Sequence, residues 1–211
     1  MINIYEYLLS KKNKTLNTLT NDNIHYVIKD LLRELGPNAD LNFLNTSEIT
    51  KMNNLFDAEK TGCVDFNGDI SRWDVSHVNT FDLMFSHCKN FDCDLSEWEL
   101  GKQDISMYGM FSKCESFNQD ISSWKVDKVY DMTHMFNGCK RFNQNISNWN
   151  VKNVENVYMM FSSGEDFLQD LSGWTFNKTC VNRAGFMHMF YNFDKFPIKF
   201  MPHQLQKLLK Q

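Results

Sequence analysis

The sequence lacks several features that would assign its 211 residues to a common functional class. It contains no run of 18 apolar residues, so no membrane insertion is predicted. Its net charge is −4 with both signs interspersed, which argues against a nucleic-acid partner, since such binders show a clustered basic face. Met1–Lys12 has no basic flank before an apolar run and no small-residue cleavage site, so it is predicted to be a helix, and the protein is expected in the cytoplasm.

Motifs of site chemistry are also missing. No C-x-x-C pair occurs, although structural zinc sites normally contain one. The glycine-rich repeat with which some repeat proteins bind calcium is absent. No His and Asp accompany a recurring Ser in the arrangement that nucleophilic catalysis requires. We therefore expect no enzymatic activity, no metal and no cofactor.

What the sequence does contain is a long internal repeat. The stretch Phe117–Val126 (FNQDISSWKV) returns as Phe142–Val151 (FNQNISNWNV), and related stretches begin at Phe66, Phe91 and Phe167. All five tryptophans share one register, with spacings of 25, 26, 25 and 25 residues: Trp73, Trp98, Trp124, Trp149 and Trp174. Self-similarity at such a period is typical of a solenoid.

Apolar spacing within one repeat predicts the shape of a coil. Ile121, Trp124 and Val126 have the L-x-x-L-x-L spacing of a leucine-rich-repeat strand. Apolar residues then recur every three to four positions through 129–136, which indicates a helical or 3-10 turn. The predicted fold is α/β: a leucine-rich-repeat-like solenoid with short parallel strands, short helical turns and the indoles facing the core.

Helical caps are predicted at both ends of the array. Residues 1–39 form the N-terminal cap, with a helix over 24–35 that is closed by a Gly-Pro pair. Residues 40–192 form a solenoid of six coils, the first of them degenerate. Residues 193–211 form the C-terminal cap, with a helix opening at Pro202.

Three recurring polar or thiol positions have alternative interpretations. The acidic positions accept hydrogen bonds from turn N–H groups, or they bind Ca²⁺; they are Asp69, Asp94, Asp120, Asn145 and Asp170. The recurring serines (71, 96, 122, 147 and 172) are interpreted as turn residues rather than nucleophiles. Cys88, Cys114 and Cys139 are interpreted as small buried residues rather than zinc ligands.

The pattern F-N-x-D-I-S-x-W-x-V-x-x-V-x-x-M-x-x-M-F-x-x-C covers about residues 40–190 and resembles the BspA-like leucine-rich repeats of bacterial surface proteins. The resemblance implies a solenoid used for adhesion or protein binding, and it brings no shared catalytic residues. A short intracellular or phage-encoded copy fits the absence of an export signal, in which case the location is a virion or the host-cell cytoplasm.

The outward positions of the predicted strands supply the candidate binding residues: Arg72, Asp74, Glu97, Glu99, Lys125, Asp127 and Lys152. They are polar and of mixed charge, and a rigid solenoid face of this kind favours a protein partner. The predicted function is therefore a non-enzymatic protein-binding module. The alternative is a glycan-binding or adhesion protein at a cell or virion surface.

Overall fold

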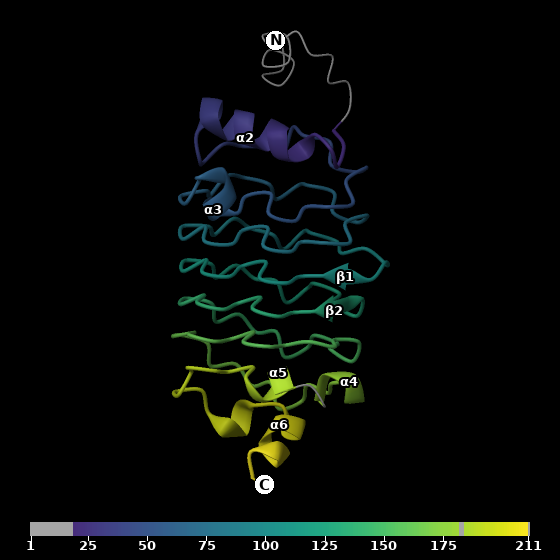
Figure 1. The fold of residues 1–211 in the computed structure, drawn as a ribbon, viewed down its shortest axis with the longest axis vertical. Coiled ribbons are helices and arrows are strands. Elements are labelled where there is room, and N and C mark those ends of the chain that lie inside the picture. Colours follow the sequence, from purple (N-terminus) through teal and green to yellow (C-terminus); the bar gives the residue numbers. More distant parts are fainter. Residues whose placement is uncertain (1–18, 182–183, 211) are drawn as a thin grey trace.

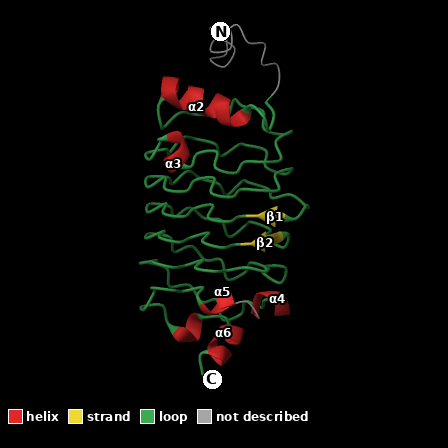
Figure 2. Cartoon of the chain, viewed as in Figure 1, coloured by secondary structure: helices red, strands yellow, loops and turns green. Residues whose placement is uncertain are grey.

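The computed structural model describes residues 19–181 and 184–210 as a column of stacked coils (Figure 1). Most of each coil consists of turns and loops, and regular secondary structure is confined to short pieces (Figure 2). The elements in chain order are α2 (Ile24–Leu35), α3 (Ala58–Thr61), β1 (Ile105–Ser106), β2 (Val129–Asp131), α4 (Lys178–Val181), α5 (Ala184–Met187), the 3-10 helix η1 (Ile198–Phe200) and α6 (His203–Leu208).

Helix α2 lies across one end of the column, where the first coil would otherwise expose its backbone (Figure 1). Its apolar face is buried, and Gly36, at a φ of +85°, ends it by donating to the carbonyl of Leu32. Asn21, just before the helix, accepts hydrogen bonds from the amides of Thr50 and Lys51, each at 3.0 Å. These contacts satisfy backbone groups of the first coil that have no preceding coil to pair with. The helix predicted over residues 2–12 lies outside the described residues.

Aromatic columns fill the interior of the stack. The ring of Phe111 lies 5.8 Å from Phe136 of the next coil, and Phe117 lies 5.9 Å from Phe142, with each pair nearly parallel. Within a coil the two columns interleave, because Phe111 and Phe117 are only 4.1 Å apart. All four rings are buried. Each repeat therefore adds one layer to a continuous core that a single repeat could not enclose.

The strands lie elsewhere than the sequence suggests. In the described residues, β1 and β2 are the two strands, and they pair in parallel with Ile105 opposite Val129. They begin after the L-x-x-L-x-L segment. In that segment the Trp124 amide instead donates to the carbonyl of Ile121, at 3.1 Å, which closes a turn. The outward candidate residues therefore project from turns and extended loop rather than from a parallel sheet.

Residues 129–136, predicted to be helical, also form a different structure. The amide of Met135 bonds within its coil to Met132, whereas the amide of Phe136 bonds to Met160 of the next coil. His134 has a φ of +56°, a left-handed conformation that interrupts a helix. A series of turns of this kind buries side chains every three to four residues, as a helix does. The spacing of apolar residues therefore cannot distinguish such turns from a helix.

Short helices close the other end of the column (Figure 1). Gln204 of α6 donates to the Phe176 carbonyl at 2.9 Å and accepts from the Phe176 amide at 2.8 Å. The carbonyl of Phe200 accepts from the Leu171 amide at 2.8 Å. These bonds pair backbone groups of the last coil with the terminal segment. No helix among residues 19–181 and 184–210 is long and apolar enough to cross a membrane.

Candidate functional site

The side chain at the recurring acidic position accepts a hydrogen bond within a turn. The Ser122 amide donates to Asp120 Oδ1 at 2.9 Å, and the Ser147 amide donates to Asn145 at 3.1 Å. The same bond forms at Asp69, Asp94 and Asp170. Hydrogen bonds from the Ser122 hydroxyl and amide lower the pKa of Asp120. The predicted turn role is confirmed. Across the described residues, no group of three or more His, Cys, Asp or Glu side chains is arranged to hold a metal ion.

The indole row faces the interior, as predicted. Trp124 is only 3% exposed, and the other four tryptophans are buried to a similar degree. Each indole N–H donates to a backbone carbonyl of the preceding coil; Trp124 binds Leu95 at 3.0 Å. A buried row of this kind offers no ring face to a sugar.

The recurring thiols are buried side chains that bridge coils. Cys88, Cys114 and Cys139 donate from Sγ to carbonyls one coil earlier, at 2.9–3.1 Å. Burial raises the pKa of the Cys114 thiol well above its ordinary value, so the thiolate that would bind metal or act as nucleophile is disfavoured. The interpretation of these residues as small buried side chains is confirmed.

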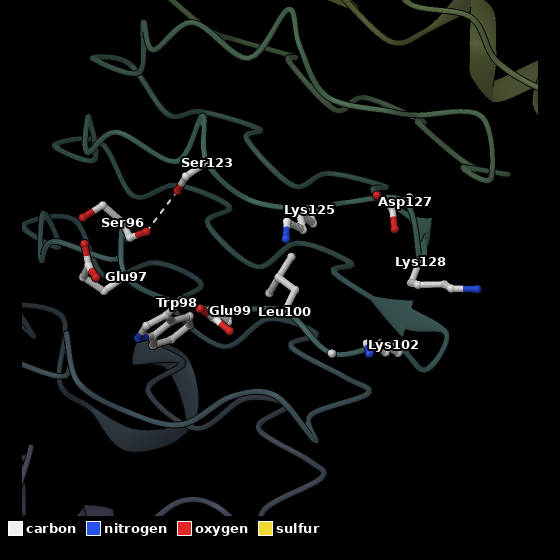
Figure 3. A pocket seen from close by; sticks show the side chains of 11 residues that line it. Ser96, Glu97, Trp98, Glu99, Leu100, Lys102, Ser123, Lys125, Asp127 and Lys128 are labelled. Carbon is white, nitrogen blue, oxygen red and sulfur yellow. Dashed lines mark hydrogen bonds between the residues drawn. The ribbon is translucent and has the colours of Figure 1, made fainter.

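Four of the seven candidate binding residues line one pocket of about 390 Å³: Glu97, Glu99, Lys125 and Asp127. Two adjacent coils supply the lining, through residues 96–102 and 123–128 (Figure 3). Asp127 is half-buried and the other three are exposed. In the part of the chain that the structure describes, no ion pair engages any of the four.

The other three candidates do not line this pocket. Arg72, Asp74 and Lys152 are exposed on other coils. The carboxylate of Asp74 is already engaged, because it accepts bonds from the Ser76 amide at 2.9 Å and from the Ser76 hydroxyl at 2.7 Å. Those bonds lower its pKa. Asp74 is therefore held in a turn like the recurring acidic residues.

The pocket lies where one coil is longer than its neighbours. The extra residue falls near Gly101, whose backbone passes so close to the carbonyl of Ser76 that a Cβ would clash with it. The side chain of Gln103 then donates to the carbonyl of Val78 at 2.7 Å, which anchors the loop to the previous coil. Lys102 and Lys128, which are absent from the predicted set, also line the pocket and add positive charge. The single spacing of 26 residues between tryptophans is the feature of the sequence that marks this place.

Comparison with known protein families identifies the family of this chain. The family described as "Mycoplasma protein of unknown function, DUF285" matches twice in tandem, over residues 26–105 and 102–202. The chain belongs to the DUF285 family. The two matches overlap at residues 102–105, beside the pocket. No curated protein and no solved structure matches the chain.

One arrangement in this DUF285 chain resembles an activated nucleophile. Ser86 Oγ lies 2.8 Å from His87 Nδ1, and His87 Nε2 lies 3.3 Å from a carboxylate oxygen of Glu59. A hydroxyl, imidazole and carboxylate in this order can generate an alkoxide nucleophile. Ser86, however, is 2% exposed, so no substrate carbonyl can reach its oxygen. The set is better explained as a polar link between α3 and the next coil.

Proposed function

We propose that this DUF285 chain is a non-enzymatic protein-binding module on a scaffold like that of leucine-rich repeats, and that its pocket at Glu97, Glu99, Lys125 and Asp127 contacts the partner. The observation that carries the proposal is that these four charged side chains line one pocket, with no ion pair among the described residues to occupy them. With Lys102 and Lys128, the lining holds three acidic and three basic side chains.

A lining of both charge signs suits a protein surface better than a small ion. A single anion or cation would meet repulsion from half of the lining, whereas a folded surface can place a charge opposite each group. Such complementarity sets orientation and on-rate more than it sets affinity. The pocket stands on a hydrogen-bonded column, so little ordering entropy is lost there on binding.

The proposal is tested by charge reversal in the pocket. Lys125→Glu together with Lys128→Glu should leave the unfolding temperature unchanged, because both side chains are exposed. A partner is first captured by the wild-type chain in its native host and identified, and the purified partner is then titrated calorimetrically. We expect binding to weaken at least about tenfold, roughly 1.4 kcal/mol. The control is Lys207→Glu on α6, which should bind as the wild type does. Equal affinity of the pocket variant would refute the assignment of the pocket.

Glycan binding is the second candidate. It requires exposed aromatic rings, and the buried indole row does not supply them. Exposed tyrosines do occur at Tyr108, Tyr130 and Tyr191. Binding of a soluble oligosaccharide by the intact chain would favour this alternative.

A further inference from the structure

A row of five aromatic side chains, none of which lines the pocket, runs along the outside of the column. Its members, hereafter the aromatic row, are Tyr108, His134, Tyr158, His188 and Tyr191. Successive ring centroids are 5.9, 5.4, 5.8 and 5.9 Å apart. Tyr108 is 38% exposed and Tyr191 is 47% exposed. His188 is also exposed, and the other two are half-buried.

The backbone fixes the spacing of the row. The Gly109 amide donates to Thr133 at 2.8 Å, and the His134 amide donates to Tyr158 at 2.9 Å, so adjacent coils are paired where the rings emerge. Parallel pairing sets neighbouring backbone segments about 4.8 Å apart, so backbone positions two coils apart are separated by about 9.6 Å. Tyr108 and Tyr158 are two coils apart, as are His134 and His188.

This backbone spacing is close to the repeat of a polyproline II helix. That helix rises about 3.1 Å per residue with three residues per turn, so prolines three residues apart lie on one side and about 9.3 Å from each other. Aromatic-lined surfaces are the usual receptors for such segments. We propose that the aromatic row binds a proline-rich segment of a partner protein in the polyproline II conformation, with prolines three residues apart packed against Tyr108 and Tyr158. This site is separate from the pocket and does not depend on it.

Hydrogen bonding suits the same occupant. A polyproline II segment has no internal hydrogen bonds, so its carbonyls accept bonds from a receptor. Tyrosine hydroxyls and an imidazole N–H are donors of the required kind. The side-chain amide of Asn137 lies 3.0 Å from His134 Nδ1, and donation there leaves the ring proton on Nε2.

Negative charge beside the aromatic row indicates which residues should flank the prolines in the bound segment. Asp82 accepts a bond from the Tyr108 amide at 3.0 Å. Burial lowers the pKa of His134, and the negative charge of nearby Asp131 opposes that shift. These carboxylates attract lysine or arginine and repel phosphate. The expected segment is therefore proline-rich with basic flanks, and a nucleic acid is disfavoured.

The test uses the full chain and a blocked oligoproline peptide with an arginine at each end. The control peptide carries the same arginines around a Gly-Ser sequence. We expect the oligoproline to bind and the control to bind at least about tenfold more weakly. The double variant Tyr108→Ala, Tyr158→Ala should lose at least tenfold in affinity for the oligoproline. Tyr26→Ala, which removes an exposed tyrosine of α2 outside the row, should not.

A second measurement does not depend on the variants folding. In the wild-type chain, the NMR ring signals of His134 and His188 should shift when the oligoproline is added. Absence of binding, unchanged histidine signals, or equal affinity of a folded double variant would each overturn the proposal. So would binding of a soluble hexose oligosaccharide in place of the peptide, lost in the double variant, which would make the row a glycan site. None of these outcomes bears on the charge reversals at the pocket.

Discussion

The indole N–H of Trp124 donates to the backbone carbonyl of Leu95, 3.0 Å away in the preceding coil. The equivalent bond recurs at every tryptophan of the chain. The indole thus fills the core and also links two coils, because it gives the Leu95 carbonyl a second donor beside the Trp98 amide of the same turn. This double role explains why Trp, rather than another large apolar residue, stands at this position.

Truncating this side chain should be strongly destabilising. Trp124→Ala removes a buried ring and leaves a cavity, so we expect a loss of about 3–5 kcal/mol in the free energy of unfolding. Trp124→Phe keeps an aromatic ring but removes the indole donor, so the Leu95 carbonyl keeps only its bond from the Trp98 amide. We expect a loss of about 0.5–1.5 kcal/mol for the missing bond. Urea unfolding followed by circular dichroism measures both. If Trp124→Phe were as stable as the wild type, the bond to Leu95 would have no structural value.

The turn role of the recurring acidic residue can be tested by comparing alanine with asparagine, which already stands at this position in the next repeat. Asp120→Ala removes the acceptor of the Ser122 amide and should lose about 0.5–1.5 kcal/mol at neutral pH. Asp120→Asn should be nearly as stable as the wild type, because Asn145 makes the same bond in the next coil. Thermal unfolding at pH 7 distinguishes the two variants. A large loss in Asp120→Asn would show that the charge, not the acceptor, is what the turn requires.

The wild type and Asp120→Asn should also differ in how their free energy of unfolding changes at acidic pH. Because folding lowers the pKa of Asp120, its contribution to stability is full above the ordinary aspartate pKa, near 3.9, and is lost as the pH falls through the folded-state value. Asp120→Asn lacks this titration. Its unfolding free energy should therefore decline less steeply below about pH 4 than that of the wild type. Parallel pH profiles would contradict the assigned shift.

The repeat, the inward-facing indoles and the turn role of the aspartates could be predicted from the sequence, because each of them depends on contacts within one repeat or on a simple period. The hydrogen bonding between the backbones of adjacent coils could not be predicted in this way. Met132, Met135 and Phe136 have helical spacing, yet the left-handed conformation of His134 turns alternate amides toward the next coil. Such pairing is fixed by the stacking of coils, which local spacing does not encode.

The candidate site was predicted in part. Glu97, Glu99, Lys125 and Asp127 meet in one pocket because their positions recur in adjacent coils. The pocket is also lined by the loop at Gly101, which contacts the preceding coil in a way that the sequence does not predict. The aromatic row was missed because its residues fall in the segment taken as helical, where ring-to-ring contacts between coils could not be foreseen.

Thiol labelling should report the burial of the cysteine position. Cys88, Cys114, Cys139 and Cys180 are buried in the folded chain, whereas Cys63 and Cys93 are partly exposed. Burial raises the pKa of Cys93 to about 11, so even this thiol should react slowly at pH 7. We expect mass spectrometry to find the two partly exposed thiols modified slowly but before the four buried ones in the folded chain, and all six modified in denaturant. Early labelling of Cys114 would contradict the packing.

His134 gives a last test, because burial lowers its pKa below the ordinary value while the charge of Asp131 opposes that shift. An imidazole whose pKa falls on folding binds its proton more tightly in the unfolded chain. Its neutral form therefore favours the folded state above the ordinary pKa, near 6.5, and that advantage is lost as the pH falls below it toward the folded-state value. His134→Gln should accordingly flatten the fall in unfolding free energy between about pH 7 and pH 5. An NMR titration of the His134 ring in the wild-type chain checks the cause directly, and a pKa at or above the ordinary value would contradict it.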